Sequence, residues 1–160
     1  MPCTLYLDGS LICAIADPPS RRASLRLTQQ LARRWWRLHS HAFHCCTSEY
    51  TFPALTTGNP HLFSARLTLA QSLMQLPTSK ECEHIEELLL SGGGLLAHDW
   101  RNGFELACAA LHGIGMFATC DGAFGAALRI PKLRFLFDSK ELVMPDIVTV
   151  LQLAEEKYDP

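Results

Sequence analysis

Short apolar runs that end in an acidic or hydroxyl-bearing residue recur along the chain. Three of them cover residues 4–7, 43–48 and 116–119, and a further short run covers residues 147–150. Runs this short and apolar suit strands that are buried on both faces, as in a parallel sheet covered by helices. The pattern therefore predicts an α/β fold built on a central, mostly parallel sheet.

Between these runs, apolar side chains recur at helical spacing. We expect helices over residues 20–38, 61–75, 79–90, 99–112 and 122–128. The buried stripe of the first of them is expected to consist of Leu27, Leu31, Trp35 and Leu38. Residues 132–137 fit either a strand, by their composition, or a helix with Pro131 in its first turn.

Size and composition fit one domain. The chain has 160 residues, 48% of them hydrophobic, which is enough to fill one core; residues 1–154 are assigned to the domain and 155–160 to a polar tail. The seven cysteines include no C-x-x-C pair, which indicates reduced thiols in a reducing compartment. No signal peptide and no apolar run long enough to span a bilayer is found, so we expect a cytoplasmic protein without membrane association.

Acidic residues follow three of the predicted strands. Asp8 comes directly after the first, Glu49 directly after the second, and Asp121 two residues after the third. If these strands are parallel neighbours, their carboxyl ends meet at one edge of the sheet, where ligands bind in open α/β folds. Three carboxylates gathered there repel one another unless a cation lies among them. The sequence therefore predicts a divalent-metal site.

In their order and spacing, three segments resemble PIN-domain proteins, most of all the small toxins of VapBC-type toxin–antitoxin pairs. The segments are residues 6–10 (Tyr-Leu-Asp-Gly-Ser), 47–50 (Thr-Ser-Glu-Tyr) and 111–121, which run from Leu-His-Gly to Thr-Cys-Asp. The resemblance covers nearly the whole chain. It implies a three-layer α/β/α sandwich on a mostly parallel sheet, Mg²⁺ or Mn²⁺ as cofactor, and endoribonuclease activity.

The resemblance also assigns site residues. Asp8 matches the first acid of the family, Glu49 the second and Asp121 the last, and all three are expected to bind metal. Ser10 and Thr119 match the hydroxyl groups that support the acids.

The third acid of the family corresponds to Asn102, which is a departure, since an amide oxygen can bind a metal but carries no charge. Asp99, one helical turn before Asn102, and Glu105, nearly one turn after it, are possible substitute acids.

Two functions follow as expectations. The first is metal-dependent hydrolysis of RNA phosphodiester bonds by the toxin of a toxin–antitoxin pair, with a small antitoxin protein as partner and a homodimer as the assembly. Oxygen ligands suit Mg²⁺, which can polarise the phosphoryl group and generate hydroxide. The second is a catalytically degraded PIN domain that binds RNA or protein, as Asn102 suggests.

An arginine-rich segment precedes the second strand. Arg21, Arg22, Arg26, Arg33, Arg34 and Arg37 surround the pair Trp35 and Trp36. They can hold RNA phosphates or dock a protein partner, or they can form a solvated helix face whose tryptophans belong to the core. The overall charge of -2 argues against a generally basic protein and leaves such a local patch open.

Overall fold

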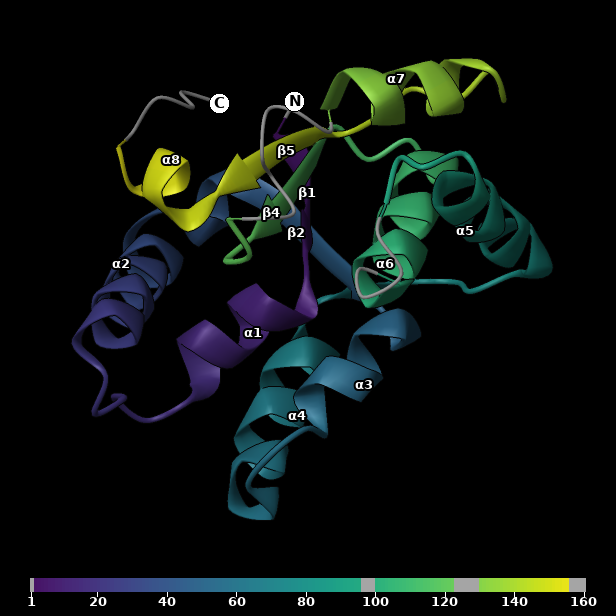
Figure 1. Cartoon of the computed structure of the whole chain (residues 1–160). Coiled ribbons are helices and arrows are strands. Elements are labelled where there is room, and N and C mark those ends of the chain that lie inside the picture. Colours follow the sequence, from purple (N-terminus) through teal and green to yellow (C-terminus); the bar gives the residue numbers. More distant parts are fainter. Residues whose placement is uncertain (1, 96–99, 123–129, 156–160) are drawn as a thin grey trace.

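The computed structural model describes residues 2–95, 100–122 and 130–155. Within them the chain forms a five-stranded sheet in the order β3-β2-β1-β4-β5, and all neighbouring strands are parallel. Figure 1 shows helices on both sides of this sheet. The strands are β1 (Cys3–Leu7), β2 (Phe43–Ser48), β3 (Met74–Leu76), β4 (Met116–Thr119) and β5 (Asp146–Thr149).

Helices fill most of the connections between the strands. The α-helices of the described part are α1 (Gly9–Ala16), α2 (Ala23–His39), α3 (Phe52–Leu55), α4 (Phe63–Ser72), α5 (Lys80–Ser91), α6 (Trp100–Leu111), α7 (Ile130–Asp138) and α8 (Val150–Ala154). Short 3-10 turns cover Ser40–Ala42, Glu49–Thr51 and Pro60–Leu62. Among the described helices, none is long and apolar enough to cross a membrane.

The sheet has a separate hydrophobic core on each face. Successive side chains of a strand point to opposite faces, so Tyr6 packs with α5, α6 and α7, whereas Leu5 and Leu7 pack with α1, α2, α4 and α8. Tyr6 stacks on Phe117 of β4, with ring centroids 5.2 Å apart. The two cores confirm the predicted three-layer α/β/α sandwich.

The prediction for residues 61–75 was wrong at its end. The helix stops at Ser72, where the backbone of Leu73 becomes extended, and Met74–Leu76 forms the edge strand β3 beside β2. Three residues are too few for an apolar pattern to separate a strand from the end of a helix. Four strands were therefore expected where the structure has five.

The predicted buried stripe of the first long helix was correct for Trp35 and in part for Leu31, which packs against the core, but wrong for Leu27 and Leu38. Of its four members only Trp35 is buried, while Leu27 and Leu38 are 58% and 44% exposed. The side that packs inward instead carries Gln29, Ala32 and Trp35, because α2 contacts both α1 and α8. Leucines on an arginine-rich helix therefore did not identify its buried face.

Other boundaries differ less. The first long helix begins at Ala23 rather than near Ser20, whose hydroxyl accepts a bond from the Arg22 N–H. Residues 132–137 belong to the helix α7. The expected helix over 122–128, the start at Asp99 of the helix over 99–112, and the tail beyond Glu155 lie outside the described residues.

The strand order places a crevice at the carboxyl ends of β1 and β4. From β1 the chain proceeds to β2 and β3 on one side, and then returns to add β4 and β5 on the other. A sheet that reverses its strand order in this way leaves room for a ligand beyond the two central strands. Asp8 follows β1 directly and Asp121 follows β4 by two residues, so both lie at this crevice.

A buried ion pair holds the helices on one side of the crevice. The guanidinium of Arg66 in α4 donates to both carboxylate oxygens of Asp17, the residue that ends α1, at 2.6 and 2.8 Å. It also donates to the backbone carbonyls of Leu55, the last residue of α3, and of Thr57, two residues later. Arg66 thereby fixes α1, α3 and α4 relative to one another.

We predict that Asp17→Asn lowers the free energy of unfolding by about 3 kcal/mol, because it leaves the buried Arg66 guanidinium without its counter-charge. Urea denaturation followed by circular dichroism measures the loss. Asp146→Asn, at an exposed position at the start of β5, is the matched control and is expected to stay within about 0.5 kcal/mol of the parent protein. Equal stabilities for the two variants would contradict this role of the ion pair.

Candidate functional site

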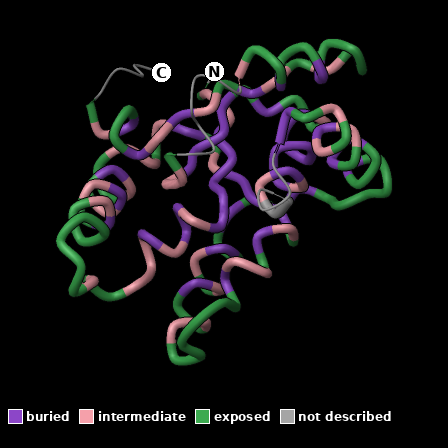
Figure 2. The backbone as a smooth tube through the Cα atoms, in the orientation of Figure 1, coloured by how far each residue is buried: buried purple, intermediate pink, exposed green. Residues whose placement is uncertain are grey.

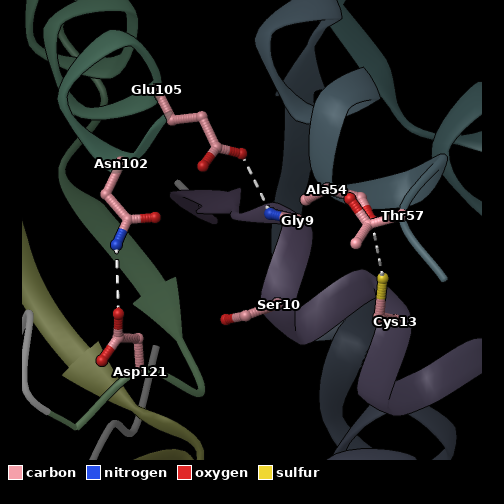
Figure 3. Close-up of a pocket in the computed structure, with 8 residues that line it drawn as sticks. All are labelled: Gly9, Ser10, Cys13, Ala54, Thr57, Asn102, Glu105 and Asp121. Carbon is pink, nitrogen blue, oxygen red and sulfur yellow. Dashed lines mark hydrogen bonds between the residues drawn. The ribbon is translucent and has the colours of Figure 1, made fainter. Parts of the chain in front are cut away.

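A pocket of about 320 Å³ opens at the crevice between α1, α3 and α6. Figure 3 shows the side chains that line it, with Asn102 and Glu105 on α6 facing α1 across the gap, and Asp121 beyond the end of β4. The lining residues are Gly9, Ser10, Cys13, Ala54, Thr57, Asn102, Glu105 and Asp121. The pocket thus collects polar groups from distant parts of the chain.

Asp8 lies beneath this pocket, fully buried, and joins β1 to β4. One of its carboxylate oxygens accepts from the Ser10 hydroxyl at 2.7 Å and the Leu11 N–H at 2.8 Å, and the other accepts from the Thr119 hydroxyl at 2.5 Å. The residue also caps the N-terminus of α1, where the helix dipole favours a negative charge. Asp8 is therefore positioned by three donors from two elements.

Ser10 and Thr119 extend this network to the far side of the crevice. The Ser10 oxygen accepts from the Cys120 N–H at 2.9 Å, and the Thr119 hydroxyl oxygen accepts from the Asp121 N–H at 2.9 Å. The two hydroxyl groups thereby hold the backbone that leads to Asp121 against the start of α1. Hydrogen bonds from Asp8 to Asp121 form one continuous chain.

Burial raises the pKa of Asp8 from 3.8 to about 6. Loss of solvation is the largest cause, and it outweighs the hydrogen bonds from Thr119, Ser10 and Leu11, which favour the charged form; the nearby charge of Asp121 raises the pKa slightly further. A carboxylate that is desolvated in this way becomes easier to ionise when a cation is near. A cation at the crevice would therefore lower the pKa of Asp8.

Asp121 and Asn102 meet at the mouth of the pocket. The Asn102 side-chain N–H donates to one Asp121 carboxylate oxygen at 3.3 Å, and both side chains are half-buried. In Figure 3 the amide oxygen of Asn102 faces the gap between α6 and α1. The amide therefore both orients Asp121 and offers an oxygen to the pocket.

Glu105 brings a third carboxylate to the crevice. It is only 2% exposed, and one of its carboxylate oxygens accepts from the Gly9 N–H, in the first turn of α1, at 2.9 Å. Gly9 also lets α1 pack closely on α3, since a Cβ at this position would lie 2.5 Å from the Cβ of Ala54. Of the two possible substitute acids, Glu105 lines the pocket, and Asp99 lies outside the described residues.

Glu49 is not among the residues that line this pocket. It is exposed at the carboxyl end of β2 and lines a separate hollow with Gln75, Leu76, Pro77 and Thr78. The structure thus brings Asn102, Glu105 and Asp121 together at the pocket, next to the buried Asp8, to which Ser10 and Thr119 donate hydrogen bonds.

Three residues of the pocket wall carried no signal in the sequence. Ala54 lies in the short helix α3 and Thr57 lies two residues after it. Cys13 lies on α1, with its thiol 3.8 Å from the Ala54 carbonyl. Burial raises the pKa of Cys13 to about 11, so its thiol is protonated at neutral pH and is a poor nucleophile. Their place in the site follows from the ion pair of Arg66, which no local pattern reveals.

The donor set fits a hard divalent cation. Two carboxylates and an amide oxygen line the pocket, and Mg²⁺ or Mn²⁺ binds oxygen ligands while keeping several waters. Over residues 2–95, 100–122 and 130–155 no cluster of three or more His, Cys, Asp or Glu side chains is arranged to hold a metal by itself. A cation here would therefore depend on Asn102 and water to complete its coordination.

The function of this site is inferred from its own chemistry, because two comparisons with known proteins gave no match. No protein-family model matches the chain, and a search of curated proteins also gave no match.

We predict that the stability difference between the wild-type protein and Asp8→Asn depends on pH. The folded pKa of about 6 lies above the ordinary 3.8, so the folded state holds this proton more tightly than the unfolded chain. The stabilisation from this proton is full below about pH 4 and is lost as the pH rises through 6. Between pH 4 and pH 8 the difference should shift in favour of the variant by up to about 3 kcal/mol.

Urea denaturation of both proteins at pH 4, 6 and 8, without divalent ions, measures this shift. Any pH-independent cost of the amide cancels when the three differences are compared. A difference that stays constant over this range would show that Asp8 is ionised in the folded protein with an ordinary pKa.

Proposed function

We propose that the protein is a divalent-metal-dependent endoribonuclease of the PIN type. The observation that carries this proposal is that Glu105 and Asp121 line one pocket at the switch point of a parallel sheet, and that the buried Asp8 is hydrogen-bonded to Ser10 in the wall of that pocket. Acidic side chains from three elements at that place are costly unless they serve a cation. The resemblance of the sequence to PIN-domain toxins supports RNA as the substrate.

The residues divide into ligands and supports. Asp121, Glu105 and the amide oxygen of Asn102 would hold Mg²⁺ or Mn²⁺, with Asp8 beneath them supplying charge. The bound ion would polarise the phosphoryl group and lower the pKa of an attacking water. Glu105, which accepts from the Gly9 N–H, would orient that water. Ser10 and Thr119 keep Asp8 in place.

The same resemblance supports the setting of this activity. We propose a cytoplasmic toxin that is restrained by a small antitoxin protein and acts as a homodimer. Glu49 is the second acid in the sequence comparison, but it lines a different hollow. For this chain we therefore assign the function of that acid to Glu105.

We predict metal-dependent cleavage of single-stranded RNA that fails in Asp121→Asn and Glu105→Gln. Each substitution removes one charge at nearly constant size, and in Glu105→Gln the new amide oxygen could still accept from the Gly9 N–H, so the fold should persist. Cleavage of fluorescent oligonucleotides with Mg²⁺ or Mn²⁺ should fall by about 100-fold or more. Equal cleavage by wild-type protein and variants, or no cleavage with either metal, would contradict the proposal.

Two further variants sharpen this measurement. Glu83→Gln removes a charge from the exposed side of α5 and serves as the matched control, with cleavage unchanged. Glu49→Gln separates the two assignments of the second acid: activity should survive it if Glu105 has that role. If Glu49→Gln abolishes cleavage and Glu105→Gln does not, the assignment by sequence is correct and the one by geometry is wrong.

A degraded PIN domain that only binds RNA or protein is the second candidate. It is favoured by the neutral Asn102 and by the lack, in the described part of the chain, of a side-chain cluster able to hold a metal alone. The two functions differ in their need for a cation, because a binding module can leave the acids at the crevice without one.

For the nuclease we predict heat of Mn²⁺ binding in calorimetry at pH 7.5, and its loss in Asp121→Asn, because that carboxylate is a direct ligand. Glu83→Gln should bind Mn²⁺ as the wild-type protein does. A wild-type protein that binds RNA but gives no heat with Mn²⁺ would favour the binding module instead.

A further inference from the structure

Positive charge is concentrated in one segment of the chain. Six of the fourteen Lys and Arg residues lie between positions 18 and 48, and none of the sixteen Asp and Glu residues does. All six are arginines, and five of them are exposed. A negatively charged molecule that approaches this segment therefore meets no carboxylate within it.

The helix α2 arranges three of these arginines along its outer side. At 3.6 residues per turn, Arg26, Arg34 and Arg37 fall within about 80° of one another around the helix axis, and they extend over about 16 Å along it. None of the three forms an ion pair with a side chain in the described residues. Figure 2 shows the outer side of α2 as exposed. We call these three side chains the arginine stripe.

An apolar groove lies on the side of α2 that carries Trp36, about 80° to 160° around the helix axis from the three arginines. It has a volume of about 500 Å³, is bounded by α1, α2 and α4, and is lined by Ile15, Ala16, Trp36, Ala65, Thr68, Leu69 and Ser72. Trp36 is half-buried and lies against Trp35, with ring centroids 6.2 Å apart. Arg33, between stripe and groove, donates to the carbonyl of Ile15 and so holds α2 against α1.

The helix therefore offers cationic side chains next to an aromatic ring at an apolar groove. Proteins that bind single-stranded nucleic acids combine these two features: arginines contact the backbone phosphates, and bases stack on an aromatic side chain. A phosphate also accepts two bonds from one guanidinium, which suits arginine better than lysine. An acidic peptide could also satisfy the charges and place an apolar side chain in the groove, whereas a single strand of RNA supplies a phosphate and a base in every nucleotide.

We propose that α2 is a binding surface for single-stranded RNA, separate from the acidic crevice. The arginine stripe contacts successive phosphates, and the groove at Trp36 accepts a base. This assignment rests on the proposed function only in its choice of RNA as the polymer. This surface binds RNA without a divalent cation, whereas the acids of the crevice repel phosphate until a cation is bound.

Binding of a fluorescent 20-nucleotide oligo(U) in EDTA, followed by anisotropy at several salt concentrations, tests the proposal. Each phosphate contact of a single strand contributes about 0.7 to the slope of log K against log salt. The triple variant Arg26→Gln/Arg34→Gln/Arg37→Gln should therefore reduce that slope by about 2. The control Lys132→Gln/Arg134→Gln/Lys140→Gln removes the same charge from exposed positions on and after α7 and should leave it nearly unchanged.

A second variant tests the groove. Trp36→Leu should weaken binding of oligo(U) by about tenfold, the loss of one stacked base, while binding of poly-glutamate in the same buffer is unchanged. Equal slopes for the two triple variants, no binding of oligo(U) by the wild-type protein, or poly-glutamate binding as tight as that of oligo(U) would each overturn the proposal. Circular dichroism confirms that every variant is folded.

These outcomes are independent of cleavage. Binding in EDTA with no cleavage in Mg²⁺ or Mn²⁺ would overturn the nuclease and leave the surface on α2 established. Metal-dependent cleavage by the wild-type protein, together with oligo(U) binding that is unchanged in the triple variant of the arginine stripe, would support the nuclease and overturn the surface on α2.

Discussion

The buried carboxylate of Asp8 is the constraint on which the site depends. It lies where the strand order reverses, and its hydrogen bonds tie the start of α1 to the end of β4. Without those bonds, Ser10 and Thr119 lose their common acceptor, and the two segments keep only the bond from the Cys120 N–H to Ser10, the contact between the Ser10 and Thr119 hydroxyl groups and the backbone bond from Asp8 to Ala118. Burial of this carboxylate removes its solvation, which destabilises its charged form and raises its pKa. The proposed cation would offset part of this cost, because a nearby positive charge favours the ionised form of a buried carboxylate.

Much of the fold could be predicted because buried parallel strands have a strong local signature. The apolar runs that become β1, β2, β4 and β5 identified the sheet, and its parallel order followed from the helices between them. The edge strand β3 escaped prediction because it has three residues and continues directly from α4. The inward side of α2 escaped it as well, since its exposed leucines mimic a core stripe and Gln29 takes the buried place, where it bonds to Ser20 and Pro18.

The site was predictable to the extent that it follows from strand ends. Asp8 and Asp121 meet because β1 and β4 are neighbours. Glu49 directly follows β2. In the sheet, β2 and β4 lie on opposite sides of β1, so β1 separates Glu49 from the end of β4. Glu105 lies in mid-helix, where a carboxylate usually belongs to a solvated face. Only the packing of α6 against the crevice turns it inward, and that packing is a property of the whole domain.

The distribution of charge separates two tasks that one surface cannot combine. A crevice with several carboxylates attracts a cation but repels a phosphate backbone, and the repulsion grows as Asp8 ionises. An arginine helix attracts the backbone but cannot activate water. The acids of the crevice lie after β1, after β4 and on α6, whereas the arginine stripe lies on α2, and α1 packs against both the crevice and α2. Under the two proposals, each region acts on its own ligand. The overall charge of -2 therefore gives no indication of either region.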